Sequence, residues 1–152
     1  MKNEYTRHEI REKALQALFP LDFNKDLSKK EAIENALLLD DFDDVLDEEN
    51  ENFVPEYLDL LVSGVIEKQA ELDEIISKHL TKKWTLKRIA KMDLIILRLA
   101  IFEMKYISNE DVPRIVAVNE AVELTKAFSD DASSKFVNGV LSNVLVDLEK
   151  ED

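Results

Sequence analysis

The feature that most constrains the fold is the run at residues 92–106, MDLIILRLAIFEMKY, which contains neither glycine nor proline. Its apolar side chains recur at steps of three and four residues, as on one face of an α-helix, and further apolar residues fill most other directions. A helix that is apolar nearly all round is packed on several sides. Charged residues, among them Asp93, Arg98 and Glu103, interrupt the run, which is also too short for a membrane-spanning helix. It therefore predicts a central core helix.

Turn-forming residues are rare in the chain. Its 152 residues include only 2 glycines and 3 prolines, whereas 45% are hydrophobic and 35% are charged. This composition favours an all-α protein, because sheets need turn residues more often. We expect a single domain over residues 1–152. The first residues lack a signal-peptide pattern and no apolar run is long enough to span a bilayer, so we expect a cytoplasmic protein with no membrane partner.

Local signals place the helix ends. Residues 6–9 (TRHE) and 28–31 (SKKE) have the capping-box pattern that opens a helix. The first helix is expected to run to about Phe19 and to be stopped or kinked by Pro20. A long helix is expected from Glu56 to about His79, followed after the central helix by one over 114–128 and one from near Ser133.

Two kinds of residue within these helices predict tertiary contacts. Gly64 and Gly139 fall inside helices, where glycine costs ~1 kcal/mol against alanine, so each predicts close helix packing. Polar residues beside the buried stripes need partners. For Arg98 we expect an ion pair with Glu103 or Glu120.

The charge is unevenly distributed. The net charge is −13, but residues 40–51 contain eight acidic side chains and no basic one, whereas residues 78–92 contain six basic side chains, His79 and no acidic one. Basic residues around an aromatic, here Trp84, are typical of a surface that binds phosphates and stacks bases. The alternative is a solvated basic face. If that surface binds a nucleic acid, we hypothesise that the acidic segment repels it from other faces.

Residues typical of catalysis are missing from the sequence. There is no phosphate-binding glycine-rich loop, no histidine pair at metal-binding spacing and no cysteine. No local Ser, His and Asp grouping suggests a nucleophile. We therefore predict a protein that is not an enzyme and that holds no metal and no cofactor.

Four strings together carry a family resemblance. They are REKALQALF at 11–19, LRLAIFE at 97–103, DVP with VAVNEAVELTKAF at 111–128, and SKFVNGVL at 134–141. Their order and spacing resemble the bacterial NusB family of transcription antitermination factors over nearly the whole chain. The resemblance implies about seven helices in two packed helical subdomains, with an N-terminal half at about 1–80 and a C-terminal half at about 81–152.

The resemblance also implies partners. It predicts binding to the boxA element of nascent rRNA-operon RNA, as a heterodimer with the small-subunit ribosomal protein NusE. This pair would act within a complex of RNA polymerase and other Nus factors. The free protein is expected as a monomer or a homodimer.

Site residues follow from the resemblance position by position. The residues expected to bind single-stranded RNA are Lys2, Arg7, His8, Arg11, His79, Lys82, Lys83 and Phe136. Those expected to face the NusE partner are Phe19 and Asp93. From the residues alone, Arg7 and Arg11 also fit an ordinary surface edge.

Two alternatives stay open. The first is an RNA-binding domain related to rRNA cytosine-5 methyltransferases, which would require a methyl-donor-binding domain beyond residue 152. The second is a helical protein-interaction module with no RNA role, for which reversing the charges of Lys82 and Lys83 would leave every partner's affinity intact.

Overall fold

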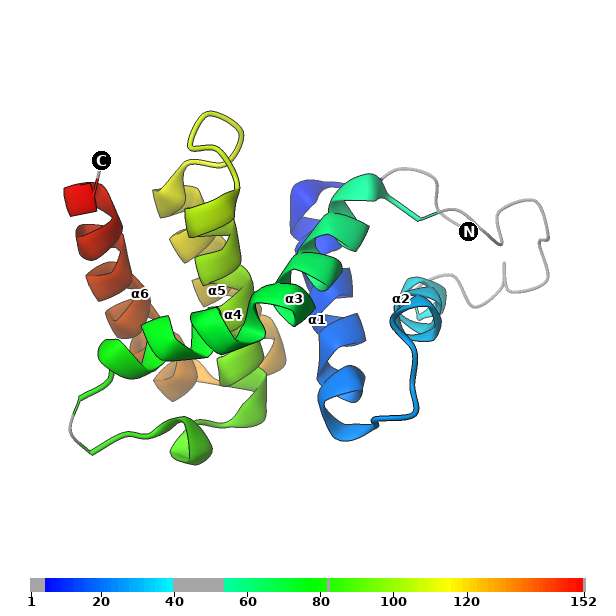
Figure 1. The fold of residues 1–152 in the computed structure, drawn as a ribbon, viewed down its shortest axis with the longest axis horizontal. Helices are drawn as coiled ribbons and strands as arrows, with labels where there is room; N and C mark the ends of the chain where they lie inside the picture. Colours follow the sequence, from blue (N-terminus) through cyan, green and yellow to red (C-terminus); the bar gives the residue numbers. More distant parts are fainter. Residues whose placement is uncertain (1–4, 40–53, 82, 152) are drawn as a thin grey trace. The chain divides into compact units, whose positions relative to one another are not determined.

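The structure is a computed structural model that describes residues 5–39, 54–81 and 83–151. Lys2, Lys82 and the acidic segment 40–51 lie outside the described residues. The described part contains six α-helices, one short 3₁₀-helix and no strand, which confirms the all-α prediction (Figure 1). Contacts divide the chain into two compact units, Met1–Gly64 and Val65–Asp152.

The first unit is built on two helices that contact each other. Helix α1 (Arg7–Phe23) contacts helix α2 (Lys29–Leu38), and the first turns of α3 (Glu56–Lys78) belong to the same unit. Both predicted capping boxes are confirmed. In α1 the Glu9 backbone N–H donates to Thr6 Oγ1 at 3.1 Å, and the Thr6 backbone N–H donates to Glu9 Oε1 at 3.0 Å. Two amide groups that a helix start otherwise leaves without partners are satisfied in this way.

The end of α1 differs from the prediction. The helix continues through Pro20 to Phe23, so Pro20 does not stop it near Phe19, and of the two predicted alternatives only the kink stays a prediction. Proline removes one backbone donor, but only one further turn remains after it. Hydrogen bonding resumes at once, because the Asn24 backbone N–H donates to the Pro20 carbonyl at 2.9 Å.

The second unit surrounds helix α4 (Lys91–Tyr106), as the apolar run predicts. Every residue of α4 from 93 to 104 is buried. Helices α5 (Arg114–Phe128) and α6 (Asp131–Glu151) contact α4 and each other (Figure 1). The later part of α3 and the 3₁₀-helix η3 (Leu86–Arg88) also belong to this unit.

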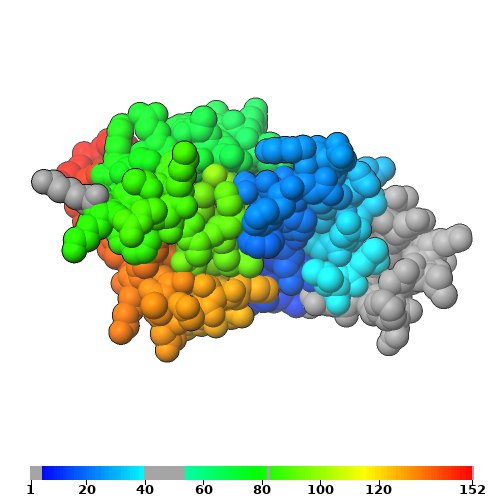
Figure 2. Space-filling model, turned by 90° about the horizontal axis from the view of Figure 1, so that it is seen from below, coloured from blue at the N-terminus to red at the C-terminus, as the bar shows by residue number. Residues whose placement is uncertain are grey.

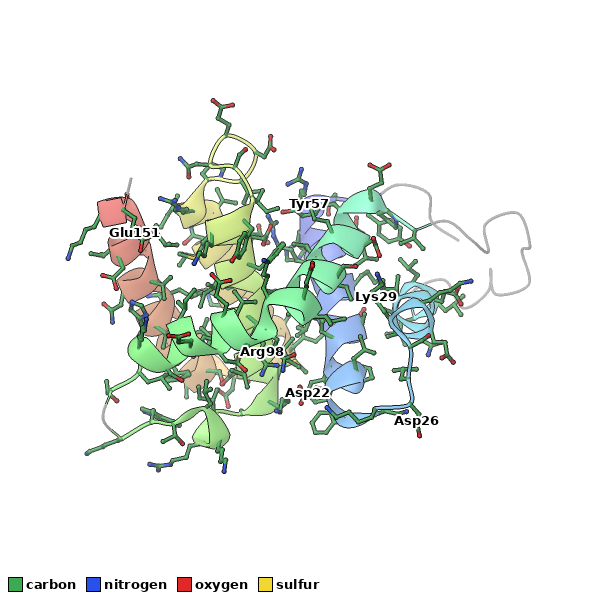
Figure 3. All side chains as sticks on the ribbon, viewed as in Figure 1. Asp22, Asp26, Lys29, Tyr57, Arg98 and Glu151 are labelled. Carbon is green, nitrogen blue, oxygen red and sulfur yellow. The ribbon has the colours of Figure 1, made fainter. Side chains whose placement is uncertain are left out.

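A partly buried ion pair ties α3 to α4. The Arg98 guanidinium, on α4, donates from Nε to Asp73 Oδ1 at 2.7 Å and from an Nη to Oδ2 at 2.9 Å. Figure 3 shows Arg98 beside α3. The sequence predicted Glu103 or Glu120 as the partner of Arg98, and Asp73 was not among the candidates. The Arg98–Asp73 pair belongs entirely to the second unit.

An exposed cluster on α3 and α4 predicts a pH dependence. Lys105 Nζ donates to Glu71 Oε1 at 2.5 Å, and the Tyr106 hydroxyl donates to the other oxygen of the same carboxylate. The Lys105 and Tyr106 hydrogen bonds lower the pKa of Glu71 below its ordinary value of 4.5. The bonds to Glu71 raise the pKa of Lys105 above 10.5 and the pKa of Tyr106 above 10.0.

We therefore expect Glu71→Gln to lower the melting temperature slightly near neutral pH. A lowered carboxyl pKa stabilises the fold above pH 4.5, and that contribution is lost as the pH falls further. The raised pKa values of Lys105 and Tyr106 stabilise the fold below pH 10.0, and this stabilisation is lost as the pH rises further. Thermal melts should show the gap between wild type and variant closing at both extremes. A gap that stays constant with pH would contradict this assignment.

Candidate nucleic-acid interface

The segment that follows α3 lies against α6. The chain leaves α3 at Lys78 and turns, with the Trp84 backbone N–H donating to the Thr81 carbonyl at 3.0 Å. The Trp84 ring packs against the ring of Phe136 on α6, with centroids 5.0 Å apart and planes tilted by 43°. Figure 2 shows the green surface of this segment next to the orange surface of the start of α6. An aromatic contact therefore anchors a basic segment on the second unit.

A hollow of about 250 Å³ lies between this segment and α6; we call it the α6 groove. One wall is formed by His79, Leu80, Thr81 and Trp84. The other is formed by Lys135, Phe136, Gly139, Val140 and Asn143. The groove thus joins two residues that the family resemblance implies for RNA, His79 and Phe136.

Exposed positive charge lies on the segment that forms one wall of the groove and at the start of α6. Lys83, Lys87 and Lys135 are exposed, and none makes an ion pair within the described part of the chain. Arg88 places its guanidinium 5.5 Å from the Trp84 ring centroid and donates to the Lys83 carbonyl. Exposed cations beside aromatic faces can attract phosphates and let bases stack.

His79 has both ring nitrogens engaged by the protein. Nδ1 lies 2.7 Å from the Ile75 carbonyl, and Nε2 lies 2.5 Å from Asp147 Oδ2. The first contact is to a residue of α3 and the second is to a residue of α6. His79 therefore lines the groove, while its Nε2 contact holds the end of α3 to α6.

Part of the groove was not predicted from the sequence, and the role predicted for one of its residues was wrong. Gly139 was expected to allow close helix packing, but a Cβ built there meets no atom within 4 Å among the described residues. That prediction is wrong. Lys135 and Asn143 were not named as candidates. The spacing of Phe136, Gly139 and Asn143, at steps of three and four on α6, is the signal that would have found them.

The predicted basic residues of α1 have different surroundings. Arg7 is exposed and its guanidinium lies 3.9 Å from the ring centroid of Tyr57, which Figure 3 labels at the start of α3. His8 Nε2 is 3.0 Å from Glu12 Oε1. Arg11 is only 4% exposed and is engaged within the protein. The RNA-binding roles of these residues stay predictions, and of the two arginines only Arg7 is exposed.

The two residues expected to face a protein partner, Phe19 and Asp93, differ in their exposure and in their contacts. Phe19 is half-buried and packs against Phe23, with ring centroids 4.9 Å apart, and Phe23 is 63% exposed. Asp93 is 5% exposed and accepts from Ser133 Oγ at 2.7 Å through Oδ2. Its Oδ1 has no hydrogen-bond partner among the described residues. Their roles toward a partner stay predictions.

A second hollow, of about 350 Å³, lies in the first unit beside α2 and the start of α3. Its basic Lys29 is neutralised, because Nζ lies 3.4 Å from Asp59 Oδ1 and donates to Ser63 Oγ at 2.7 Å. This mixed charge offers no aromatic and basic surface of the kind found at the α6 groove.

Two other features are absent from the described ranges of the chain. None of the helices in these ranges combines the length and the apolar character that crossing a membrane requires. Nor do these ranges contain a group of three or more His, Asp or Glu side chains placed to hold a metal ion.

The fold and the groove define an all-helical protein that carries a groove with basic and aromatic side chains in its walls. The model of the NusB family matches residues 8–146, so the chain belongs to the NusB family. The transcription antitermination protein NusB of Enterococcus faecalis is 62% identical over 150 residues, covering 99% of this chain and 96% of the relative. The Bacillus subtilis protein of the same name is 51% identical over 144 residues, covering 95% and 98%.

Solved structures of NusB proteins have the same fold as this chain. Thermotoga maritima (T. maritima) NusB superposes with a TM-score of 0.74 at 30% identity, covering 93% of this chain and 92% of that one. A structure described as antitermination factors NusB and NusE in complex with double-stranded RNA superposes at 0.71 with 25% identity, covering 91% and 95%. The family is not enzymatic, which confirms the predicted absence of catalysis.

Proposed function

We propose that this chain is a cytoplasmic transcription antitermination factor that binds the boxA element of nascent rRNA-operon RNA. It does so as a heterodimer with the ribosomal protein NusE, in a Nus complex on RNA polymerase. The observation that carries the proposal is the match to antitermination relatives over nearly the full chain. A related NusB has been solved together with NusE and RNA, which supports both partners.

The α6 groove suggests how the binding works. Lys83, Lys87 and Lys135 neutralise phosphates, and each such contact steepens the fall of affinity with salt by about 0.7 in a plot of log K against log salt. Trp84 and Phe136 offer ring faces to unstacked bases, which is how proteins read single-stranded RNA. The NusE protein adds contact surface, so each partner should raise the affinity of the other for RNA by the same factor.

The test is a titration of single-stranded boxA RNA at about 50 and about 200 mM salt, with and without the ribosomal protein. Trp84 is the only tryptophan in the chain, so its fluorescence reports on the groove without a label. We expect binding that quenches Trp84, weakens with salt and tightens with the partner. Binding indifferent to boxA mutation and to the partner would refute the proposal and favour a protein-interaction module.

Arg7 and Tyr57 give a second prediction for RNA binding. Arg7→Ala should lower RNA affinity and reduce the salt slope by about 0.7, because one phosphate contact is lost. Tyr57→Leu should weaken binding by roughly threefold, because the stacked ring fixes the guanidinium. Tyr57→Phe keeps the ring and should bind like wild type.

A double-mutant cycle isolates this coupling. In the Arg7→Ala background, Tyr57→Leu should have no further effect on affinity if Tyr57 acts through Arg7. Melting temperatures of all variants check that the first unit stays folded. Additive losses would show that Tyr57 contributes independently of Arg7.

A further inference from the structure

Gly139 has no explanation inside the molecule. It lies within α6, where glycine is less favourable than alanine. It has no positive φ, so its backbone does not need a glycine. A Cβ there would meet nothing within 4 Å among the described residues, so internal crowding does not need one either. What remains is the open space in front of it, which is the α6 groove.

The groove has the chemistry of a base-binding subsite. Trp84 is 41% exposed beside Phe136, so an aromatic face is available at the groove wall. Asn143 lies one helical turn beyond Gly139, is exposed, and carries both donors and an acceptor that can pair with a base edge. Exposed Lys135 supplies positive charge at the other end of the same wall. At about 250 Å³ the hollow is smaller than the pockets that hold drug-sized ligands.

We propose that the α6 groove holds one unstacked nucleobase of the bound RNA, that Gly139 provides the clearance for it, and that Asn143 reads its edge. This inference rests on the proposed RNA-binding function and names a subsite within it. The occupant is a base rather than a protein side chain because the exposed lysines on the groove wall and on the adjoining segment match a phosphate backbone. A methyl group at residue 139 would then occupy space that the base needs.

The test uses opposite effects on stability and affinity. Gly139→Ala should raise the melting temperature by about 2–4 °C, because alanine favours the helix and its Cβ clashes with nothing. The same variant should bind single-stranded boxA RNA about tenfold more weakly. Ser142→Ala is the matched control, since Ser142 is exposed on the same helix and does not line the groove. It should leave the affinity unchanged.

Asn143→Ala provides an independent variant should Gly139→Ala disturb the fold. Wild type should discriminate among oligo-A, oligo-C, oligo-G and oligo-U of equal length, and Asn143→Ala should reduce that discrimination. If wild type binds RNA and both variants bind like wild type, the subsite is refuted and the proposed function stands. If both variants instead lower only the affinity for the ribosomal protein and leave the RNA affinity unchanged, the groove binds a protein side chain. If wild type binds no RNA, both proposals fail.

Discussion

Replacing Asp73 with alanine should lower the free energy of unfolding by about 3 kcal/mol. The carboxylate accepts two hydrogen bonds from Arg98, whose side chain is 6% exposed on the helix at the centre of the second unit. Removing Asp73 takes two charge-assisted hydrogen bonds from a guanidinium that is itself buried, and this loss dominates the destabilisation. The melting temperature should fall by roughly 6–12 °C.

Two further variants distinguish the effect of losing the ion pair from the effect of a substitution on α3 as such. Glu67→Ala changes an exposed carboxylate on the same helix and should alter stability by no more than about 0.5 kcal/mol. Asp73→Leu combined with Arg98→Met replaces the pair by apolar side chains and should recover part of the loss, because neither charge is then buried. A loss below about 1 kcal/mol for Asp73→Ala would show that the pair contributes little.

Local signals in the sequence predicted the helices well. The apolar run predicted that α4 is buried all round, and residues 93–104 are buried without a break. The two capping boxes fixed the starts of α1 and α2. These features depend on neighbours within one or two turns, which the sequence displays directly. Pro20 shows the limit, because whether a helix survives a proline depends on the contacts that hold its last turn.

Long-range contacts were predicted less well. Arg98 was known to need an acidic partner, but many carboxylates lie at helical spacing, and only packing selects Asp73. Gly139 was interpreted as a close-packing residue because a sequence cannot distinguish a crowded helix face from an open one. The resemblance named His79 and Phe136 separately, whereas the structure supplies the groove between them and adds Asn143.

Trp84→Ala should weaken binding of single-stranded boxA RNA by about tenfold or more. In the proposed subsite the Trp84 ring, which packs against Phe136, supports a base, and stacking of a base on an aromatic side chain contributes roughly 1–3 kcal/mol. Stacking involves no counterion release, so the salt slope should keep its wild-type value. The measurement is a titration with fluorescently labelled RNA at several salt concentrations, because this variant lacks the tryptophan signal.

Matched variants separate stacking from charge at the same surface. Trp84→Phe keeps an aromatic face and should recover most of the affinity. Lys83→Gln removes an exposed cation beside Trp84 and should reduce the salt slope by about 0.7, with its largest effect on affinity at low salt. A Trp84→Ala variant whose salt slope falls as that of Lys83→Gln does would mean that the ring only positions the basic segment. In that case the bases are read elsewhere, and the α6 groove contributes phosphate contacts alone.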